Sequence, residues 1–138
     1  MSGYESETPA LVLDNGSYSL KVGFAGEDIP RHEVRSLLSR GSDVSSGVSA
    51  TTATTKGLNK VSFHDAAVAA VDADRPIIGG VVVDWDAMEK LWKLTFDDAM
   101  KASTSDHPLI ITESPLNEGE AREQMAEILF EKFDSPAL

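Results

Sequence analysis

The sequence predicts one α/β domain built on a mixed sheet, and three features of the chain lead to this fold class. An Asn-Gly pair, Asn15-Gly16, stands between two short apolar runs, which is a strong signal for a β-hairpin. The second half alternates strand-like and helix-like patterns, as chains with crossover connections do. The 138 residues, 41% of them hydrophobic, suffice for one domain with its own core.

The first half contains the hairpin and a third strand. Ala10 to Leu13 is a short apolar run that ends at Asp14, and Tyr18 to Phe24 returns as the second strand. The Asn-Gly pair joins them as a tight turn, because both residue types tolerate positive φ. Val34 to Leu38 is the predicted third strand. Alternation along the second strand places four side chains on one face: Tyr18, Leu20, Val22 and Phe24.

The middle of the chain has a different composition. Residues 41–57, GSDVSSGVSATTATTKG, are small side chains that can bury little area. We interpret them as an exposed loop, which serves either as a plain surface linker or as a contact loop. Residues 66–71 fit a helical turn and a strand equally well. Ile77 to Val83, interrupted by Gly79 and Gly80, regains the pattern of a strand.

Two amphipathic helices and a buried strand follow. Asp84 is the predicted N-cap of a helix over residues 85–102. Pro108 to Thr112 is a strand, and Asn117 with Glu120 resembles a capping box that opens the second helix. Apolar residues at steps of three and four form the two buried stripes: Trp85, Met88, Trp92, Phe96 and Ala99 in the first helix, and Ala121, Met125, Ile128, Leu129 and Phe133 in the second.

Charge and composition exclude several classes of function. A net charge of −11 disfavours direct binding to a nucleic-acid backbone, because that affinity comes mostly from Lys and Arg. The chain has no cysteine, so it has no disulfide and no thiolate metal site. No apolar stretch is long enough to span a bilayer, and the polar N-terminus lacks a signal-peptide pattern. We therefore expect a soluble cytosolic or nuclear protein without a membrane partner.

Signatures of nucleophilic and metal chemistry are absent from the sequence. The three histidines, His32, His64 and His107, are scattered and have no second ligand at helix or hairpin spacing. The chain contains no G-x-S-x-G elbow, no Walker-type loop and no G-x-G-x-x-G. Glu113 stands at a strand end and has the chemistry of a general base, but the sequence supplies no partner for it.

The stretch from Asp14 to Lys21 is the main candidate for a binding site, and it has two interpretations. In the first, the Asn-Gly turn is a structural hairpin and nothing more. In the second, the tight Gly-Ser turn directs backbone N–H groups and a hydroxyl to one point, which suits a phosphate. Asp14 then holds the waters around a divalent cation, and Lys21 brings its ammonium over the same phosphates. The local pattern by itself leaves both interpretations open.

Three blocks of sequence resemble actin and the actin-related proteins. The first is LVLDNGSYSLKVGFAGEDIPR, which is similar to the family's opening strand, phosphate loop and the run that follows. The resemblance resumes at Pro76 and Gly80 and is closer in VVVDWDAMEKLWKLTF. It continues through HPLIITESPLNEGEAREQMAEILFEKFDSPAL, so the blocks occur in family order. The resemblance favours the phosphate-loop interpretation of the opening stretch.

The resemblance implies an actin-like ATPase fold of the ribonuclease H-like type, of which this chain is an incomplete first part. Residues 1–40 and 76–138 are expected to form the first half of the large subdomain, and residues 41–75 the small inserted subdomain. The implied ligand is ATP or ADP with Mg, and Asp14 is expected to contact Mg through water. The family's second phosphate loop and most of its adenine pocket are expected beyond Leu138, so this chain alone should bind ATP poorly. The residues implied in binding the nucleotide are Asn15, Gly16, Ser17, Tyr18, Ser19 and Lys21.

Three departures from the family pattern bear on activity. Tyr18 stands where actin has a glycine after the loop's serine, which puts hydrolysis in more doubt than binding. Gly79 replaces a histidine near the family's interlobe phosphate sensor. Residues 43–57 offer Ser, Thr and Ala in place of the apolar loop by which actin subunits contact their neighbours. Little apolar area would be buried there, so a stable actin-type filament is disfavoured.

The resemblance leaves two roles. The first is a divergent actin-like protein that acts in cytoskeletal assembly, with actin or other actin-fold subunits as partners, in the cytoplasm. The second is an actin-related scaffold subunit of a multi-subunit chromatin-remodelling or dynein-activating complex, with structural ATP and little hydrolysis; the chromatin-remodelling case places it in the nucleus. A third interpretation, from the residues alone, is a self-contained binding module in which the hairpin is only structural.

Overall fold

A four-stranded mixed sheet organises the chain. The computed structural model describes residues 8–39 and 73–138. The sheet has the order β3-β2-β1-β8, built from β3 (His32–Arg35), β2 (Ser19–Phe24), β1 (Leu11–Asn15) and β8 (Leu109–Ile111). β8 runs parallel to β1, whereas the other pairs are antiparallel, so the predicted mixed α/β fold is confirmed.

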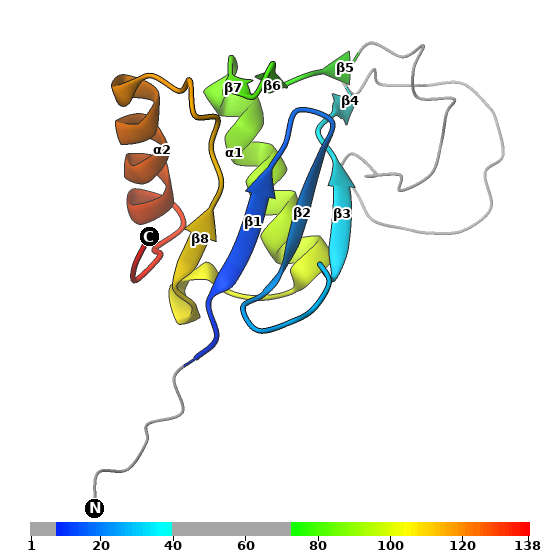
Figure 1. Cartoon of the computed structure of the whole chain (residues 1–138), viewed down its shortest axis with the longest axis vertical. Helices are drawn as coiled ribbons and strands as arrows, with labels where there is room; N and C mark the ends of the chain where they lie inside the picture. The colour runs from blue at the N-terminus through cyan, green and yellow to red at the C-terminus, as the bar shows by residue number, and fades with distance from the viewer. Residues whose placement is uncertain (1–7, 40–72) are drawn as a thin grey trace, which may run out of the picture.

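Helices cover one face of the sheet. Figure 1 shows α1 (Trp85–Lys93) and the following π-helix η2 (Leu94–Met100) crossing behind β1, β2 and β3, with α2 (Gly119–Glu131) beyond β8. A short 3-10 turn, η3 (Thr104–Asp106), leads into β8. Two small two-stranded sheets lie at one end of the main sheet. They are β4 (Leu38–Ser39) with β5 (Ala73–Asp74), and β6 (Ile77–Ile78) with β7 (Val81–Val82).

The core lies between the sheet and these helices. Every second side chain of a strand points toward the helices. The helices face the sheet with apolar residues spaced three and four positions apart. The predicted stripes are confirmed at Met88, Trp92, Phe96, Met125, Ile128 and Leu129, all of which are buried. The sheet contributes Leu11, Leu13, Leu20, Val22, Val34 and Leu109 to the same cluster.

The hairpin between β1 and β2 is confirmed, but its turn differs from the prediction. Neither Asn15 nor Gly16 has a positive φ. The positive-φ pair is instead Gly79 (φ 59°) and Gly80 (φ 83°), which join β6 to β7. These values match a two-residue type I′ turn, a conformation that favours glycine at both positions.

The predicted strand ends also moved. The pattern predicts Tyr18 as the first residue of the second strand, but β2 begins at Ser19 and Tyr18 is 64% exposed. The predicted strand Val34 to Leu38 is divided between β3 and β4. Ser36 causes the division, because its N–H donates to the Tyr18 carbonyl and its hydroxyl donates to the Gly16 carbonyl. A contact with the hairpin loop thus replaces regular strand pairing at this residue.

The first helix begins as predicted and then changes type. The Asp84 carboxylate accepts a hydrogen bond from the Ala87 N–H at 2.9 Å, which confirms the N-cap. After Lys93 the backbone is a π-helix, and it ends at Lys101 in a left-handed conformation. The Leu91 carbonyl accepts from the Leu94 N–H and from the Thr95 hydroxyl, so the ordinary α-helical acceptor of residue 95 is occupied.

The predicted capping box of the second helix is wrong. The N-cap of α2 is Glu118, whose side chain makes no capping hydrogen bond. The Asn117 amide donates instead to Glu113 at 3.0 Å. Glu113 also accepts from Arg122, and this fixed carboxylate holds the Asn117 side chain through its amide N–H. The predicted loop at 41–57 and the ambiguous segment at 66–71 lie outside the described residues, and the division into subdomains stays a prediction.

Candidate functional site

Asp14 stands where two parallel strands end. β1 and β8 pair as far as Leu13 and Ile111, so the next residues, Asp14 within β1 and Thr112 after β8, come together. The Thr112 hydroxyl donates to Asp14 Oδ1 at 2.7 Å. The Asn15 N–H donates to the same Thr112 oxygen at 3.0 Å. Thr112 therefore fixes the orientation of the carboxylate at the start of the hairpin loop.

Lys21 lies across the hairpin from Asp14. The antiparallel register pairs the two residues, and Lys21 Nζ is 3.8 Å from Asp14 Oδ2. The two side chains are about half exposed, Lys21 at 47% and Asp14 at 51%. This loose, solvated ion pair contributes little to stability. The ammonium and the carboxylate therefore both remain accessible to a ligand at the mouth of the hairpin.

Gly16 is required at its position by close approach and not by its φ. A Cβ built on Gly16 would lie 2.5 Å from the Ser19 carbonyl oxygen, a distance that backbone atoms cannot accept. The Gly16 carbonyl accepts from the Ser36 hydroxyl at 2.6 Å, which ties the loop to the segment after β3. The Ser17 hydroxyl oxygen accepts from the Gly80 N–H at 2.7 Å. Two distant segments thus hold the loop in one shape.

The loop presents hydrogen-bond donors that its own fold does not use. Within residues 8–39 and 73–138, no group accepts from the backbone N–H of Ser17 or Tyr18. The Ser17 hydroxyl accepts a bond and retains its proton for donation. Together with the Lys21 ammonium, these donors suit a phosphate group, and the Asp14 carboxylate suits a hydrated divalent cation. The donor set therefore fits the group that the sequence predicts here.

Two other predicted site residues have partners of their own. Ser19 is buried, and its hydroxyl donates to Glu33 Oε1 at 2.6 Å, so the hydroxyl is not among the free donors. The Asn15 side-chain oxygen accepts from the Trp92 indole N–H at 3.2 Å. Asn15 therefore anchors the loop to the core.

Tyr18 is held against β3. The guanidinium carbon of Arg35 lies 4.0 Å from the centre of the Tyr18 ring, and Arg35 Nη1 donates to the Tyr18 hydroxyl. This is a cation–π contact combined with a hydrogen bond. Together with the bond from the Ser36 N–H to the Tyr18 carbonyl, it pins the loop to β3.

Glu113 is a fixed carboxylate and not a poised base. Its Oε1 accepts from Arg122 at 2.6 Å and its Oε2 accepts from Asn117 at 3.0 Å. The hydrogen bond from Arg122, followed by that from Asn117, lowers the pKa of Glu113 below its usual value. A lowered pKa weakens a carboxylate as a general base at neutral pH. The structure thus supplies partners for Glu113, but they favour a structural role.

Sequence reasoning missed the residues that support the loop. Thr112, Ser36 and Gly80 are separated from the residues that they contact by 98, 20 and 63 positions. A usable signal existed for Thr112, because a polar residue after a strand that runs parallel to β1 meets Asp14 at the same sheet edge. No comparable local signal marks Ser36 or Gly80.

Two kinds of site are absent from the part of the chain that the structure describes. Across 8–39 and 73–138, no group of three or more His, Cys, Asp and Glu side chains is placed to hold a metal ion. In the same part of the chain, no helix has the length and apolar character needed to cross a membrane.

Comparisons with known proteins agree with the resemblance. The family model described as Actin matches residues 5–138. An "Actin-like protein" from Neurospora crassa is 35% identical over 139 residues, which covers 93% of this chain and 33% of that relative. The chain therefore spans about a third of the length of this curated relative.

Proposed function

Because the chain belongs to the actin family, we propose that residues 14–21 form one phosphate-binding loop of a Mg-ATP site. The observation that carries the proposal is the set of free donors at the hairpin mouth. The N–H groups of Ser17 and Tyr18 have no acceptor among the described residues, and the half-exposed Lys21 ammonium lies 3.8 Å from the Asp14 carboxylate. Such convergent donors bind phosphate with little reorganisation, because neighbouring segments already fix the loop.

Each residue has a distinct role in this proposal. The loop amides and the Ser17 hydroxyl hold phosphate oxygens, and Lys21 neutralises their charge. Asp14, oriented by Thr112, holds water molecules of the magnesium ion. Bound Mg-ATP supplies a terminal phosphate whose presence or absence distinguishes two nucleotide states. The chain covers 33% of its N. crassa relative, so we propose that the remaining part of the family fold completes the site.

Hydrogen exchange tests this assignment at the atoms concerned. We expect Mg-ATP to slow amide exchange at Ser17 and Tyr18 in the longest native form of the protein, because phosphate oxygens replace water as acceptors. The 138-residue chain, measured in parallel, should show much weaker protection, since half of the site is missing. Exchange that is unchanged in the loop of a protein that binds ATP would place the nucleotide elsewhere.

For the complete protein we propose a role in cytoskeletal assembly, with actin or other actin-fold subunits as partners in the cytoplasm. A second candidate is a scaffold subunit of a chromatin-remodelling or dynein-activator complex, which holds ATP structurally and can be nuclear. The contact between Tyr18 and Arg35 favours this second candidate, because it holds a bulky side chain at the loop and so limits how closely the backbone can approach the phosphates. Sedimentation with ATP separates the two: filaments that pellet support the first role, and a soluble protein supports the second.

The Tyr18→Gly variant tests whether this contact restrains hydrolysis. We expect the variant to hydrolyse ATP several-fold faster, because the loop loses its attachment to Arg35 and the backbone can approach the phosphates more closely. Tyr18→Phe is the matched control, since it keeps the ring over Arg35 and loses only the hydroxyl contact. Steady-state phosphate release from the longest native form measures both. Equal rates in wild type and Tyr18→Gly would mean that hydrolysis is set elsewhere.

A further inference from the structure

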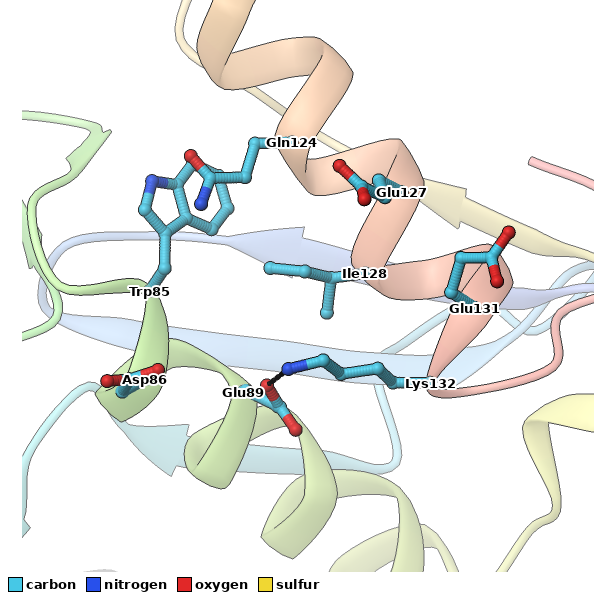
Figure 2. A pocket seen from close by; sticks show the side chains of 8 residues that line it. All are labelled: Trp85, Asp86, Glu89, Gln124, Glu127, Ile128, Glu131 and Lys132. Carbon is cyan, nitrogen blue, oxygen red and sulfur yellow. Dashed lines mark hydrogen bonds and ion pairs between the residues drawn. The ribbon is translucent and has the colours of Figure 1, made fainter.

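A groove lies between α1 and α2. Its volume is about 220 Å³, which is room for about seven water molecules or one long side chain. Figure 2 shows Ile128 near its centre, Trp85 at one end and carboxylates around the rim. The lining residues are Trp85, Asp86 and Glu89 of α1, Gln124, Glu127, Ile128 and Glu131 of α2, and Lys132.

The rim of the groove carries more negative charge than its own cation neutralises. Four carboxylates line it, Asp86, Glu89, Glu127 and Glu131, against the single ammonium of Lys132. Lys132 donates to Glu89, as the dashed line in Figure 2 marks. In the described part of the chain, the other three carboxylates form no hydrogen bond or ion pair. The groove therefore has an unbalanced charge of −3.

Lys132 shows that this field favours a cation. The hydrogen bond to Glu89 raises the pKa of Lys132, and the charges of Glu89, Asp86 and Glu127 act in the same direction. The lysine side chain already reaches across the opening from the end of α2 to α1. Lys132 thus shows that an ammonium group fits this groove, and the other three carboxylates have no such cationic partner among the described residues.

Two of the unpaired carboxylates do not help their own helix. Glu127 and Glu131 lie in the last five residues of α2, and its last turn contains no basic residue. Negative charge near a helix C-terminus opposes the helix dipole, so these side chains disfavour the helix that carries them. Asp86 is different, because it lies in the first turn of α1, where the dipole favours an acid. Helix stability therefore explains Asp86 but leaves Glu127 and Glu131 unexplained.

We propose that this groove docks a basic segment of a protein partner, with one Arg or Lys side chain inserted between Glu127 and Glu131. The ring of Trp85 and the Ile128 side chain provide an apolar wall for the methylene groups of that side chain. Charge complementarity on this scale mainly sets partner choice and association rate. The proposal goes beyond the nucleotide site and does not depend on it.

Fluorescence anisotropy with a labelled peptide of alternating Arg and Leu tests the proposal. The groove variant is Glu127→Gln with Glu131→Gln, and the matched control is Glu120→Gln with Glu123→Gln, which removes the same charge from α2 outside the groove. We expect the groove variant to weaken binding about 3- to 10-fold, and the control to change it about twofold or less. Thermal unfolding should show no loss of stability in the groove variant, because the helix dipole is relieved.

Several outcomes would overturn the proposal. Equal weakening by the two double variants would mean that the peptide responds to the overall charge of −11 and not to the groove. No binding of the peptide at low salt would exclude a basic partner. A dimer that dissociates in salt and resists the peptide would assign the groove to a second copy of the chain. If the peptide binds the 138-residue chain but not a longer native form, the groove is the docking site of another segment of the same protein.

Discussion

Replacing Trp92 with alanine is expected to lower the free energy of unfolding by about 3–5 kcal/mol. The Trp92 side chain is 0% exposed and lies at the centre of the core. Its ring meets Trp85 and Phe133 edge-on, with centroids 6.4 and 6.2 Å away. Because small domains are stable by only about 5–15 kcal/mol, such a loss leaves the chain close to unfolding at room temperature.

Urea unfolding followed by circular dichroism measures this loss. Trp92→Phe is the control, since it keeps an aromatic ring in the core but removes the indole N–H that donates to Asn15. We expect the control to lose much less stability than the alanine variant. A loss below about 1 kcal/mol in Trp92→Ala would contradict the described core, because removing a buried tryptophan side chain lowers the free energy of unfolding by more than this.

The sequence contained enough information for the elements whose signals are local and strong. The stripe from Trp85 to Phe96 repeats at helical spacing, and Asp84 supplies an N-cap that the structure confirms. The hairpin of β1 and β2 follows from two apolar runs separated by Asn15-Gly16. In these cases propensity, periodicity and tertiary packing all agree, which is why the predictions succeed.

The predictions failed where a side chain has a hydrogen-bond partner that hydrophobic periodicity and capping preferences do not indicate. Asn117 donates to Glu113 instead of capping α2, because Arg122 fixes that carboxylate beside it. Ser36 leaves the sheet to bind the loop carbonyl of Gly16. The Thr95 hydroxyl donates to the Leu91 carbonyl, and the backbone from Leu94 to Met100 is a π-helix. The Ser36 contact spans 20 positions, whereas Asn117 and Thr95 each contact a residue four positions earlier, and no periodic pattern marks these contacts.

In the candidate site too, some residues could be predicted from the sequence and others could not. Its proposed ligand-binding residues all lie between Asp14 and Lys21, so one stretch of sequence contained them. The residues that hold this stretch in shape come from three other parts of the fold. Thr112 follows β8, Ser36 follows β3 and Gly80 belongs to the turn between β6 and β7. The candidate residues could therefore be named from the sequence, whereas the residues that support them required the fold.

Replacing Asp14 with asparagine is expected to weaken Mg-dependent ATP binding by about 10- to 100-fold, as the loss of a group that orients metal ligands does. Asparagine keeps an oxygen for the Thr112 hydroxyl, which donates to Asp14 Oδ1 at 2.7 Å in the wild type. The variant removes only the solvated contact with Lys21, so the fold should lose about 1 kcal/mol or less. A change in affinity can therefore be assigned to the site and not to unfolding.

The most direct test of the account is the affinity of the longest native form for ATP, titrated with and without Mg, in wild type and Asp14→Asn. The control is Asp98→Asn, an exposed acid of η2 away from the loop. We predict that Mg strengthens ATP binding in the wild type and in Asp98→Asn, and that Asp14→Asn loses most of this Mg dependence. If Asp14→Asn binds Mg-ATP as tightly as the wild type, the loop from Asp14 to Lys21 is a structural hairpin and not a phosphate loop.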